Sequence, residues 1–449
     1  MGTVFARKAL TPGGWAADVR LRVEEGRIVD LESGVPAAAT DDVAALVIPG
    51  LVNGHSHAFQ RALAGHAEQR SPAGEDSFWT WRERMYELAT RLDAPALAAI
   101  AAQAYCEMLA SGYTTVAEFH YLAGAAGDGD AMFDALVAAA SRSGIRLCYV
   151  PVLYERAGFE ATGPAGKQTL FALDLPTFLA RHARARLQES DRLSVAIGAH
   201  SLRAVSEASL YEIAAVARDT GSPLHLHIAE QRREVEDCVA ATGSRPVEWL
   251  LKHCAVDALW CLVHATQMDV AETAQLAGTG AVVCLCPSTE ANLGDGLFPL
   301  RPFLDSGGTI AVGSDSQVSI NPFEELRWLE YGQRLATGTR NVVALDHGHV
   351  GHELFAHVLA GGARAAGQRT AGLVPGAFAD LVVLDENDAM LAGHDDPSRL
   401  DALVFSGYPL PIERVMVHGE WRVIGGRHVR RDETRDEFAR ALARIGAAR

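Results

Sequence analysis

Short apolar runs alternate with helical segments along the middle of the chain, and this alternation predicts β–α units around a parallel sheet. In the helical segments apolar residues recur three or four positions apart, and glycines just past several segments are the expected helix caps. The predicted helices cover residues 77–92, 95–110, 130–143, 206–219 and 322–335. The predicted strands end near His55, Phe119, Leu153, His200, Ala229, His264, Cys286 and Asp315. Eight such units predict a TIM-like (β/α)8 barrel.

The two ends of the chain have a different pattern, with short alternating segments and tight turns that are typical of β-strands. Neither end alone has enough strands to cover a hydrophobic face, so we expect the two ends to share one domain. The predicted strands are 18–23, 27–31, 380–384, 402–405, 412–418 and 420–424. The sequence therefore predicts an α/β fold in two domains: a barrel over residues 48–372 and a small discontinuous β-sandwich over residues 1–47 and 373–449.

The composition excludes several classes of protein. Apolar residues make up 49% and charged residues 21% of the 449 positions, as in an ordinary globular protein. The formal net charge of −16 argues against nucleic acid or an anionic membrane as the main partner. The chain has no apolar stretch near the roughly 18 residues that span a membrane, and its first residues lack the apolar segment of a signal peptide. Seven cysteines without metal-knuckle spacing fit a reducing compartment, so we expect a cytoplasmic protein.

Histidines and an aspartate stand at several predicted strand ends. His55 and His57 are two residues apart and project to the same side of the first strand end. His227, His264 and Asp315 end the fifth, sixth and eighth strands. The carboxyl ends of barrel strands meet at one mouth, so these five side chains should converge there. Imidazole and carboxylate ligands suit Zn²⁺ or another borderline divalent ion, and the sequence therefore predicts a metal site.

The segments around these residues resemble the amidohydrolase superfamily. The resemblance rests on residues 49–57 (PGLVNGHSH), on the histidines of the fifth and sixth strands and on the segment Gly-Ser-Asp315, and it covers nearly the whole chain. Within the superfamily, four further segments are similar to those of the formimidoylglutamate deiminases of histidine degradation. These segments are 58–62, 76–82, 200–205 and 227–231. The resemblance implies hydrolysis of N-formimino-L-glutamate to N-formyl-L-glutamate and ammonia.

The resemblance also implies a metal centre with a single ion. It implies one Zn²⁺ per chain, bound by His55, His57, His227 and Asp315. Members with two ions need a bridging carboxylate or modified lysine on a middle strand, and neither the third nor the fourth predicted strand ends in lysine. Glu155, just past the third strand, leaves a bridging carboxylate open.

Three residues are expected to carry the reaction. Zinc lowers the pKa of bound water toward about 7, so hydroxide becomes available at neutral pH. Glu230, three residues beyond His227, is expected to move a proton from the attacking water to the leaving nitrogen. Asp315 is expected to share the role of base, and His264 to polarise the tetrahedral intermediate. The alternative interpretation of Glu230 is a carboxylate that the dipole of a helix N-terminus favours.

The substrate that the resemblance implies carries two carboxylates, and an acidic protein needs local arginines to hold them. Arg82 and Arg203 belong to the similar segments and are the predicted carboxylate contacts. Gln60 and Tyr121 follow strand ends and are further candidate contacts, with a purely structural hydrogen bond as the alternative. His200 is a candidate either for substrate binding or for orienting a neighbour.

Two other functions fit parts of the sequence. A sister deaminase that acts on guanine, another purine or a pterin would use the same metal ligands, although a neutral ring has less need of two arginines. A non-catalytic barrel that binds a partner is the second alternative, but every expected ligand is present. A homodimer is implied by the resemblance alone.

Overall fold

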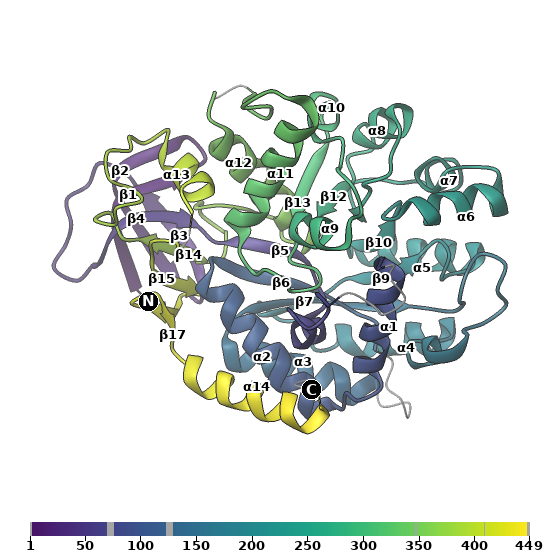
Figure 1. Ribbon diagram of the computed structural model, residues 1–449. Helices are drawn as coiled ribbons and strands as arrows, with labels where there is room; N and C mark the ends of the chain where they lie inside the picture. The colour runs from purple at the N-terminus through teal and green to yellow at the C-terminus, as the bar shows by residue number, and fades with distance from the viewer. Residues whose placement is uncertain (1, 70–75, 123–128, 346–347, 408, 447–449) are drawn as a thin grey trace.

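The computed structural model describes residues 2–69, 76–122, 129–345, 348–407 and 409–446. A parallel sheet surrounded by helices forms the larger part of the molecule (Figure 1). A second sheet lies beside it and combines purple strands from the N-terminal end with yellow-green strands from the C-terminal end (Figure 1). Among the described residues, every helix is too short or too polar to cross a lipid bilayer.

The parallel sheet forms the predicted barrel. Its strand order is β13-β12-β11-β10-β9-β7-β6-β5, and an isolated bridge between Ser56 and Asp315 brings its two edges together. The strands are β5 (Leu51–Ser56), β6 (Tyr113–His120), β7 (Arg146–Leu153), β8 (Leu193–Val195, paired only with β7), β9 (Ile197–Ser201), β10 (Leu224–Ile228), β11 (Trp260–His264), β12 (Val282–Leu285) and β13 (Thr309–Val312). The eight predicted strand ends are therefore confirmed; the largest shift is at β13, which ends at Val312 rather than Asp315.

Helices surround the barrel, and the five predicted helices are confirmed. They begin and end where the sequence provides caps: the Asn321 side chain accepts hydrogen bonds from two backbone amides at the start of α11, and Gly221 ends α5 in the left-handed conformation with φ of 66°. The barrel helices are η1 (Ala58–Leu63), α1 (Phe78–Ala89), α2 (Ala94–Ala110), α3 (Gly129–Ser143), η2 (Gly166–Leu170), α4 (Leu175–Arg186), α5 (Glu207–Thr220), α6 (Arg232–Thr242), α7 (Pro246–His253), α8 (Val270–Ala277), α9 (Pro287–Leu293), α10 (Leu300–Asp305), α11 (Pro322–Thr337) and α12 (Val350–Ala365).

Both chain ends contribute strands to the second sheet. Its order is β17-β16-β15-β14-β4-β1-β2-β3, and the antiparallel pairing of β4 with β14 joins the two ends into one continuous sheet. Its strands are β1 (Gly2–Thr11), β2 (Gly14–Glu24), β3 (Arg27–Glu32), β4 (Asp42–Pro49), β14 (Leu381–Leu384), β15 (Ile412–Val417), β16 (Glu420–Ile424) and β17 (Arg427–His428). The last helix, α14 (Arg431–Ile445), packs against α2 of the barrel (Figure 1).

One predicted strand is wrong. Residues 402–405 lie in a helix, α13 (Arg399–Phe405), rather than in the second sheet. A run of four apolar residues has no period of its own, so a short buried helix and a buried strand cannot be distinguished by pattern. Here Leu400, Leu403 and Val404 are all buried, which a single helical turn achieves as well as a strand does.

A buried carboxyl group makes the stability of the barrel dependent on pH. Glu325 on α11 is fully buried, and its carboxylate accepts hydrogen bonds from the backbone amide (2.8 Å) and the hydroxyl (2.6 Å) of Ser288 on α9. Burial raises the pKa of Glu325 from its ordinary value of 4.5 to about 8. Because the folded chain then holds a proton that the unfolded chain has already lost, the stability should fall as the pH rises through this interval.

We expect Glu325→Gln to flatten this dependence, because the amide resembles the protonated carboxyl group and does not ionise. Calorimetry between about pH 5 and 8 should show a melting temperature that falls less steeply in the variant than in the parent. Glu236→Gln, at an exposed position of α6, provides the control. Parallel curves for Glu325→Gln and the parent would contradict the expectation.

Candidate metal-dependent active site

The candidate site is a pocket at the carboxyl ends of the barrel strands. All the residues that the sequence predicted for this site line the pocket except His55, which is completely buried and whose Nε2 atom lies beside those of two lining histidines. The predicted residues in the lining are His57, Gln60, Arg82, Tyr121, His200, Arg203, His227, Glu230, His264 and Asp315. The fold therefore brings together side chains that are far apart in the sequence: His57 and Asp315 are separated by 258 positions.

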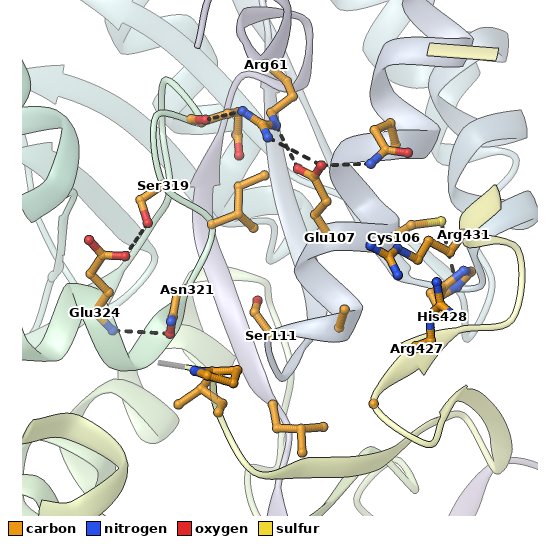
Figure 2. Close-up of a pocket in the computed structure, with 18 of the residues that line it drawn as sticks. Arg61, Cys106, Glu107, Ser111, Ser319, Asn321, Glu324, Arg427, His428 and Arg431 are labelled. Atoms are coloured by element: carbon orange, nitrogen blue, oxygen red, sulfur yellow. Dashed lines mark hydrogen bonds and ion pairs between the residues drawn. The ribbon is translucent and has the colours of Figure 1, made fainter. Parts of the chain in front are cut away.

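A larger cavity, of about 950 Å³, lies between α2, α11 and the start of α14 (Figure 2). Its polar walls are bonded to one another: Arg61 pairs with Glu107, and Ser319 donates a hydrogen bond to Glu324 (Figure 2). The described residues contain three groups of side chains that could hold a metal, and none lies in this cavity. The pocket at the strand ends is smaller, about 50 Å³, but histidines and carboxylates converge there, so chemistry rather than size identifies the site.

Three histidines and one aspartate face a common point. The Nε2 atom of His55 lies 3.1 Å from Nε2 of His57 and 3.0 Å from Nε2 of His227. Asp315 completes the set, with Oδ1 at 3.3 Å from Nε2 of His57 and 3.5 Å from Nε2 of His55. Tetrahedral zinc with ligands at about 2.0–2.1 Å requires ligand atoms about 3.3 Å apart. The three histidine nitrogens therefore form a group that could hold a metal, and Asp315 lies beside two of them as the candidate fourth ligand.

Hydrogen bonds fix the rings in the orientation that a metal needs. The Nδ1–H group of His57 donates to the carbonyl of Phe119 (2.8 Å), and that of His227 donates to the carbonyl of His200 (3.0 Å). Each ring therefore directs an unprotonated Nε2 at the common point, which is the usual arrangement around a bound metal. Burial lowers the pKa of His55, His57 and His227, so all three are neutral and able to act as ligands.

The backbone around the two histidines at the end of β5 is held by a side chain of the next strand. Glu118 on β6 is buried, and its carboxylate accepts hydrogen bonds from the Ser56 hydroxyl and the Ala58 amide, each 2.7 Å long. On the other side, β13 approaches β5 so closely that a Cβ at Gly313 would lie 2.6 Å from the His55 carbonyl oxygen. Glycine at position 313 therefore allows Asp315 to reach the histidines.

Glu230 and His264 form a second group beside the first. Nε2 of His264 lies 3.8 Å from Oε1 of Glu230 and 3.8 Å from Oδ2 of Asp315. Burial raises the pKa of Glu230 to about 7. Burial lowers the pKa of His264, but Glu230 and the other nearby carboxylates outweigh this effect and raise it to about 10. The arrangement can therefore hold and move a proton next to the metal ligands.

Two arginines line the pocket without a carboxylate partner. Neither the Arg82 nor the Arg203 guanidinium makes an ion pair or hydrogen bond with any described residue, and Nε of Arg82 is buried. Both lie near the Trp79 ring, with the guanidinium carbon of Arg82 at 4.3 Å and that of Arg203 at 5.8 Å from its centroid. Two half-buried guanidiniums without a directly paired carboxylate favour an anionic ligand.

The remaining predicted contacts also line the pocket. The Gln60 amide donates a hydrogen bond to the Tyr121 hydroxyl (2.9 Å), while its buried Oε1 has no partner among the described residues. The His200 carbonyl holds His227, as described above, and its ring lies against those of Tyr121 and Tyr154. The bond to His227 comes from the backbone of residue 200, so the role of the His200 side chain stays a prediction; its ring lines the pocket.

Glu155 lies outside the cluster of histidines. Its carboxylate accepts hydrogen bonds from the Ser206 amide and the Ser209 hydroxyl, each 2.7 Å long, at the start of α5. This carboxylate belongs to none of the groups that could hold a metal in the described part of the chain. The structure therefore gives no support to a bridging carboxylate at this position.

Several buried carboxyl groups around the site escaped the sequence analysis. Asp295 lies close to Glu230 and His264, accepts a hydrogen bond from the Gln231 amide, and has one carboxyl oxygen without a partner among the described residues. Burial and the neighbouring Glu230 raise the pKa of Asp295 to about 10. It follows a helix rather than a strand, so its position along the chain carries no signal for the site.

The fold and the site define the class of protein. The model of the amidohydrolase family matches residues 46–422. The chain belongs to the amidohydrolase family, which confirms the resemblance that the motifs indicated. A second model, described as the N-terminal domain of formimidoylglutamate deiminase HutF, matches residues 1–45.

Individual relatives agree with these matches. Formimidoylglutamate deiminase of Pseudomonas aeruginosa is 44% identical, over 99% of this chain and all of that protein. 8-oxoguanine deaminase of the same organism is 29% identical, over 93% of this chain and 92% of that protein. A crystal structure of an amidohydrolase from Brucella melitensis is 42% identical and superposes with a TM-score of 0.94, covering 99% of this chain and all of that one.

Proposed function

We propose that the chain hydrolyses N-formimino-L-glutamate to N-formyl-L-glutamate and ammonia, as a step of histidine degradation. The observation that carries this proposal is the pair of guanidiniums without an ion-pair partner, Arg82 and Arg203, in the same pocket as the histidine and aspartate donor atoms. The formimidoylglutamate deiminase at 44% identity supports the same substrate. The arginines explain why that substrate, with two carboxylates, is preferred to a neutral one.

The residues that would hold the metal are His55, His57, His227 and Asp315. We propose one Zn²⁺ per chain, because three imidazoles and one carboxylate suit zinc. A zinc ion bound there would supply hydroxide at neutral pH by lowering the pKa of water. His57 and His227 would keep their ligand atoms in place through their hydrogen bonds to backbone carbonyls.

Glu230 is placed to manage the protons of the reaction. Its carboxylate would accept a proton from the attacking water and deliver it to the nitrogen that leaves as ammonia, while a carbon–oxygen bond forms and the carbon–nitrogen bond breaks. Asp315 would share the role of base. The Nε2 atom of His264 lies 3.8 Å from the carboxylates of Glu230 and Asp315. His264 would stabilise the charge that develops on the atoms bonded to the carbon under attack.

Arg82 and Arg203 would each bind one carboxylate of the substrate, and Gln60, Tyr121 and His200 would complete the pocket. The buried Oε1 of Gln60 is available to accept a hydrogen bond from the substrate. The Tyr121 hydroxyl already accepts a hydrogen bond from the Gln60 amide, which fixes the orientation of the Gln60 side chain. Trp79 lies near both guanidiniums and limits their freedom to move.

We expect Arg203→Ala to raise the KM for N-formimino-L-glutamate by about 10- to 100-fold, with a smaller change in kcat. A hydrogen-bonded carboxylate contributes about this much binding free energy. Steady-state release of ammonia measures both constants. Arg218→Ala, at an exposed position of α5, is the control and should match the parent. An unchanged KM in Arg203→Ala would reassign the carboxylate contact.

The same experiment separates the proposal from its main alternative. The 8-oxoguanine deaminase relative shows that purine deaminases are similar over most of the chain. A neutral heterocycle would gain little from Arg203, so its KM should be nearly insensitive to the alanine substitution. The non-catalytic alternative has lost support, because the predicted donor atoms converge on one point.

Two further properties belong to the proposal. All seven cysteines are free, and six are buried, which supports a role in the reducing cytoplasm. The protein would act there as a homodimer, a property that rests on the resemblance to the family. Nucleic acid and membrane partners are not part of the proposal, since the net charge of −16 disfavours both.

A further inference from the structure

His264 occupies an unusual backbone conformation. Its φ is 72° and that of Ala265 is 52°, so two consecutive residues with side chains lie in the left-handed region. Such conformations are disfavoured for most residues and persist only where the surroundings impose them. The hydrogen bonds of the Ala265 amide to the carbonyls of Ile228 and Val263 hold this turn at the end of β11. The turn alone does not fix the direction of the His264 ring.

The Glu290 carboxylate contacts that ring from behind. Its Oε1 lies 3.2 Å from Nδ1 of His264 and 2.8 Å from the backbone nitrogen of Cys286, which donates a hydrogen bond to it. Glu290 is on α9, directly after β12, and only 5% of its surface is exposed. The bond to the Cys286 amide anchors the carboxylate to the end of the neighbouring strand, so its position does not depend on His264.

We propose that Glu290 is the positioning residue for His264. Its carboxylate accepts the Nδ1–H of the imidazole, which fixes the ring plane and leaves Nε2 facing Glu230 and Asp315, at 3.8 Å from each. None of the roles assigned above includes Glu290. The inference rests on the proposed function only in that His264 takes part in the reaction.

Glu230 is held in a parallel way. The Glu234 carboxylate on α6 accepts hydrogen bonds from the backbone amides of Ala229 (3.2 Å) and Glu230 (3.0 Å). Ala229, like His264, is left-handed, with φ of 49°. At both strand ends a buried glutamate from a barrel helix therefore holds part of the site: Glu234 holds the backbone that presents Glu230, and Glu290 holds the His264 ring. This repetition indicates that Glu290 serves the site rather than the stability of α9.

The structure provides a matched control for Glu290. Glu325 is also a buried glutamate bonded to α9, through the amide and hydroxyl of Ser288, but none of its hydrogen bonds reaches a residue of the site. Glu325→Gln therefore perturbs the same helix without releasing His264. Comparing it with Glu290→Gln and Glu290→Ala separates a local effect on His264 from a general effect on α9.

We expect Glu290→Ala to lower kcat by about 10- to 100-fold while KM for N-formimino-L-glutamate stays within about threefold and metal content is unchanged. Glu290→Gln should lie between this variant and the parent, since the amide oxygen can accept the same hydrogen bonds without the charge. Glu325→Gln should retain the parent kcat. A kcat in Glu290→Ala within threefold of the parent, or equal losses in Glu290→Gln and Glu325→Gln, would overturn the proposal.

A spectroscopic measurement keeps this test separate from the identity of the substrate. Long-range ¹H–¹⁵N correlation of the histidine rings, with His264 assigned by His264→Gln, reports which ring nitrogen carries the proton. The proposal expects a protonated, hydrogen-bonded Nδ1 in the parent and in Glu325→Gln, and a changed Nδ1 signal in Glu290→Ala. An identical His264 spectrum in the parent and Glu290→Ala would overturn the proposal even if another compound were the substrate.

Discussion

Replacing Glu230 by glutamine should lower kcat by about three orders of magnitude while leaving the metal content of the protein unchanged. General acid–base catalysis contributes about 10²- to 10⁴-fold, and an amide cannot carry the proton from the water to the leaving nitrogen. The substitution preserves the volume of the side chain, and the backbone amides of Ala229 and Glu230 remain bonded to Glu234. The loss should therefore appear in kcat rather than in folding.

A neighbouring glutamate on α6 provides the control for this prediction. Glu236→Gln removes a carboxylate at an exposed position of α6, the helix that follows Glu230, and should match the parent in kcat and KM. Ammonia release by both variants, with their metal content measured in parallel, tests whether Glu230 transfers the proton. A kcat for Glu230→Gln within tenfold of the parent would remove Glu230 from the path of the proton.

Replacing Asp315 by alanine should have an even larger effect, because its carboxylate is both a proposed metal ligand and a neighbour of His264. We expect kcat to fall by about four orders of magnitude and zinc to be lost on dialysis, since a metal with fewer ligands binds less tightly. The far-ultraviolet circular dichroism should stay that of the parent. Only the ion and the reaction should be lost.

Asp219→Ala, at an exposed position of α5, is the matched control and should retain both metal and turnover. Elemental analysis of the two variants after identical dialysis gives the comparison. One tightly bound zinc in Asp315→Ala, with turnover near that of the parent, would show that the ion is held elsewhere. Unfolding of Asp315→Ala alone would be recognised by its circular dichroism, and Asp315→Asn would then replace it in the test.

The barrel could be predicted from the sequence because each strand is a short apolar run that ends in polar or turn residues. β10 ends at Ile228 and β11 at His264, within one residue of the predicted ends. The run at 402–405 carried the same apolar signal and forms a helix, because four buried residues show no period. The pattern predicted that the two chain ends share one domain, but it does not indicate that β4 and β14 are the strands that pair, because they lie more than three hundred residues apart.

The candidate site could be predicted where its residues stand at strand ends. His55, His57, His227, His264 and Asp315 share that position, and the topology of a barrel brings such positions together. Glu290 and Asp295 reach the same site from α9 and the turn after it. A glutamate in the first turn of a helix is common for electrostatic reasons, so sequence alone gives no sign that Glu290 contacts His264.

Ammonia release from N-formimino-L-glutamate by the zinc-loaded protein tests the central claim most directly. Guanine and 8-oxoguanine serve as comparison substrates, and the second product is identified as N-formyl-L-glutamate by mass spectrometry. The account predicts rapid release from N-formimino-L-glutamate, none above background from the purines, and loss of activity on chelation in proportion to the zinc removed. Release from a purine and none from N-formimino-L-glutamate would contradict it.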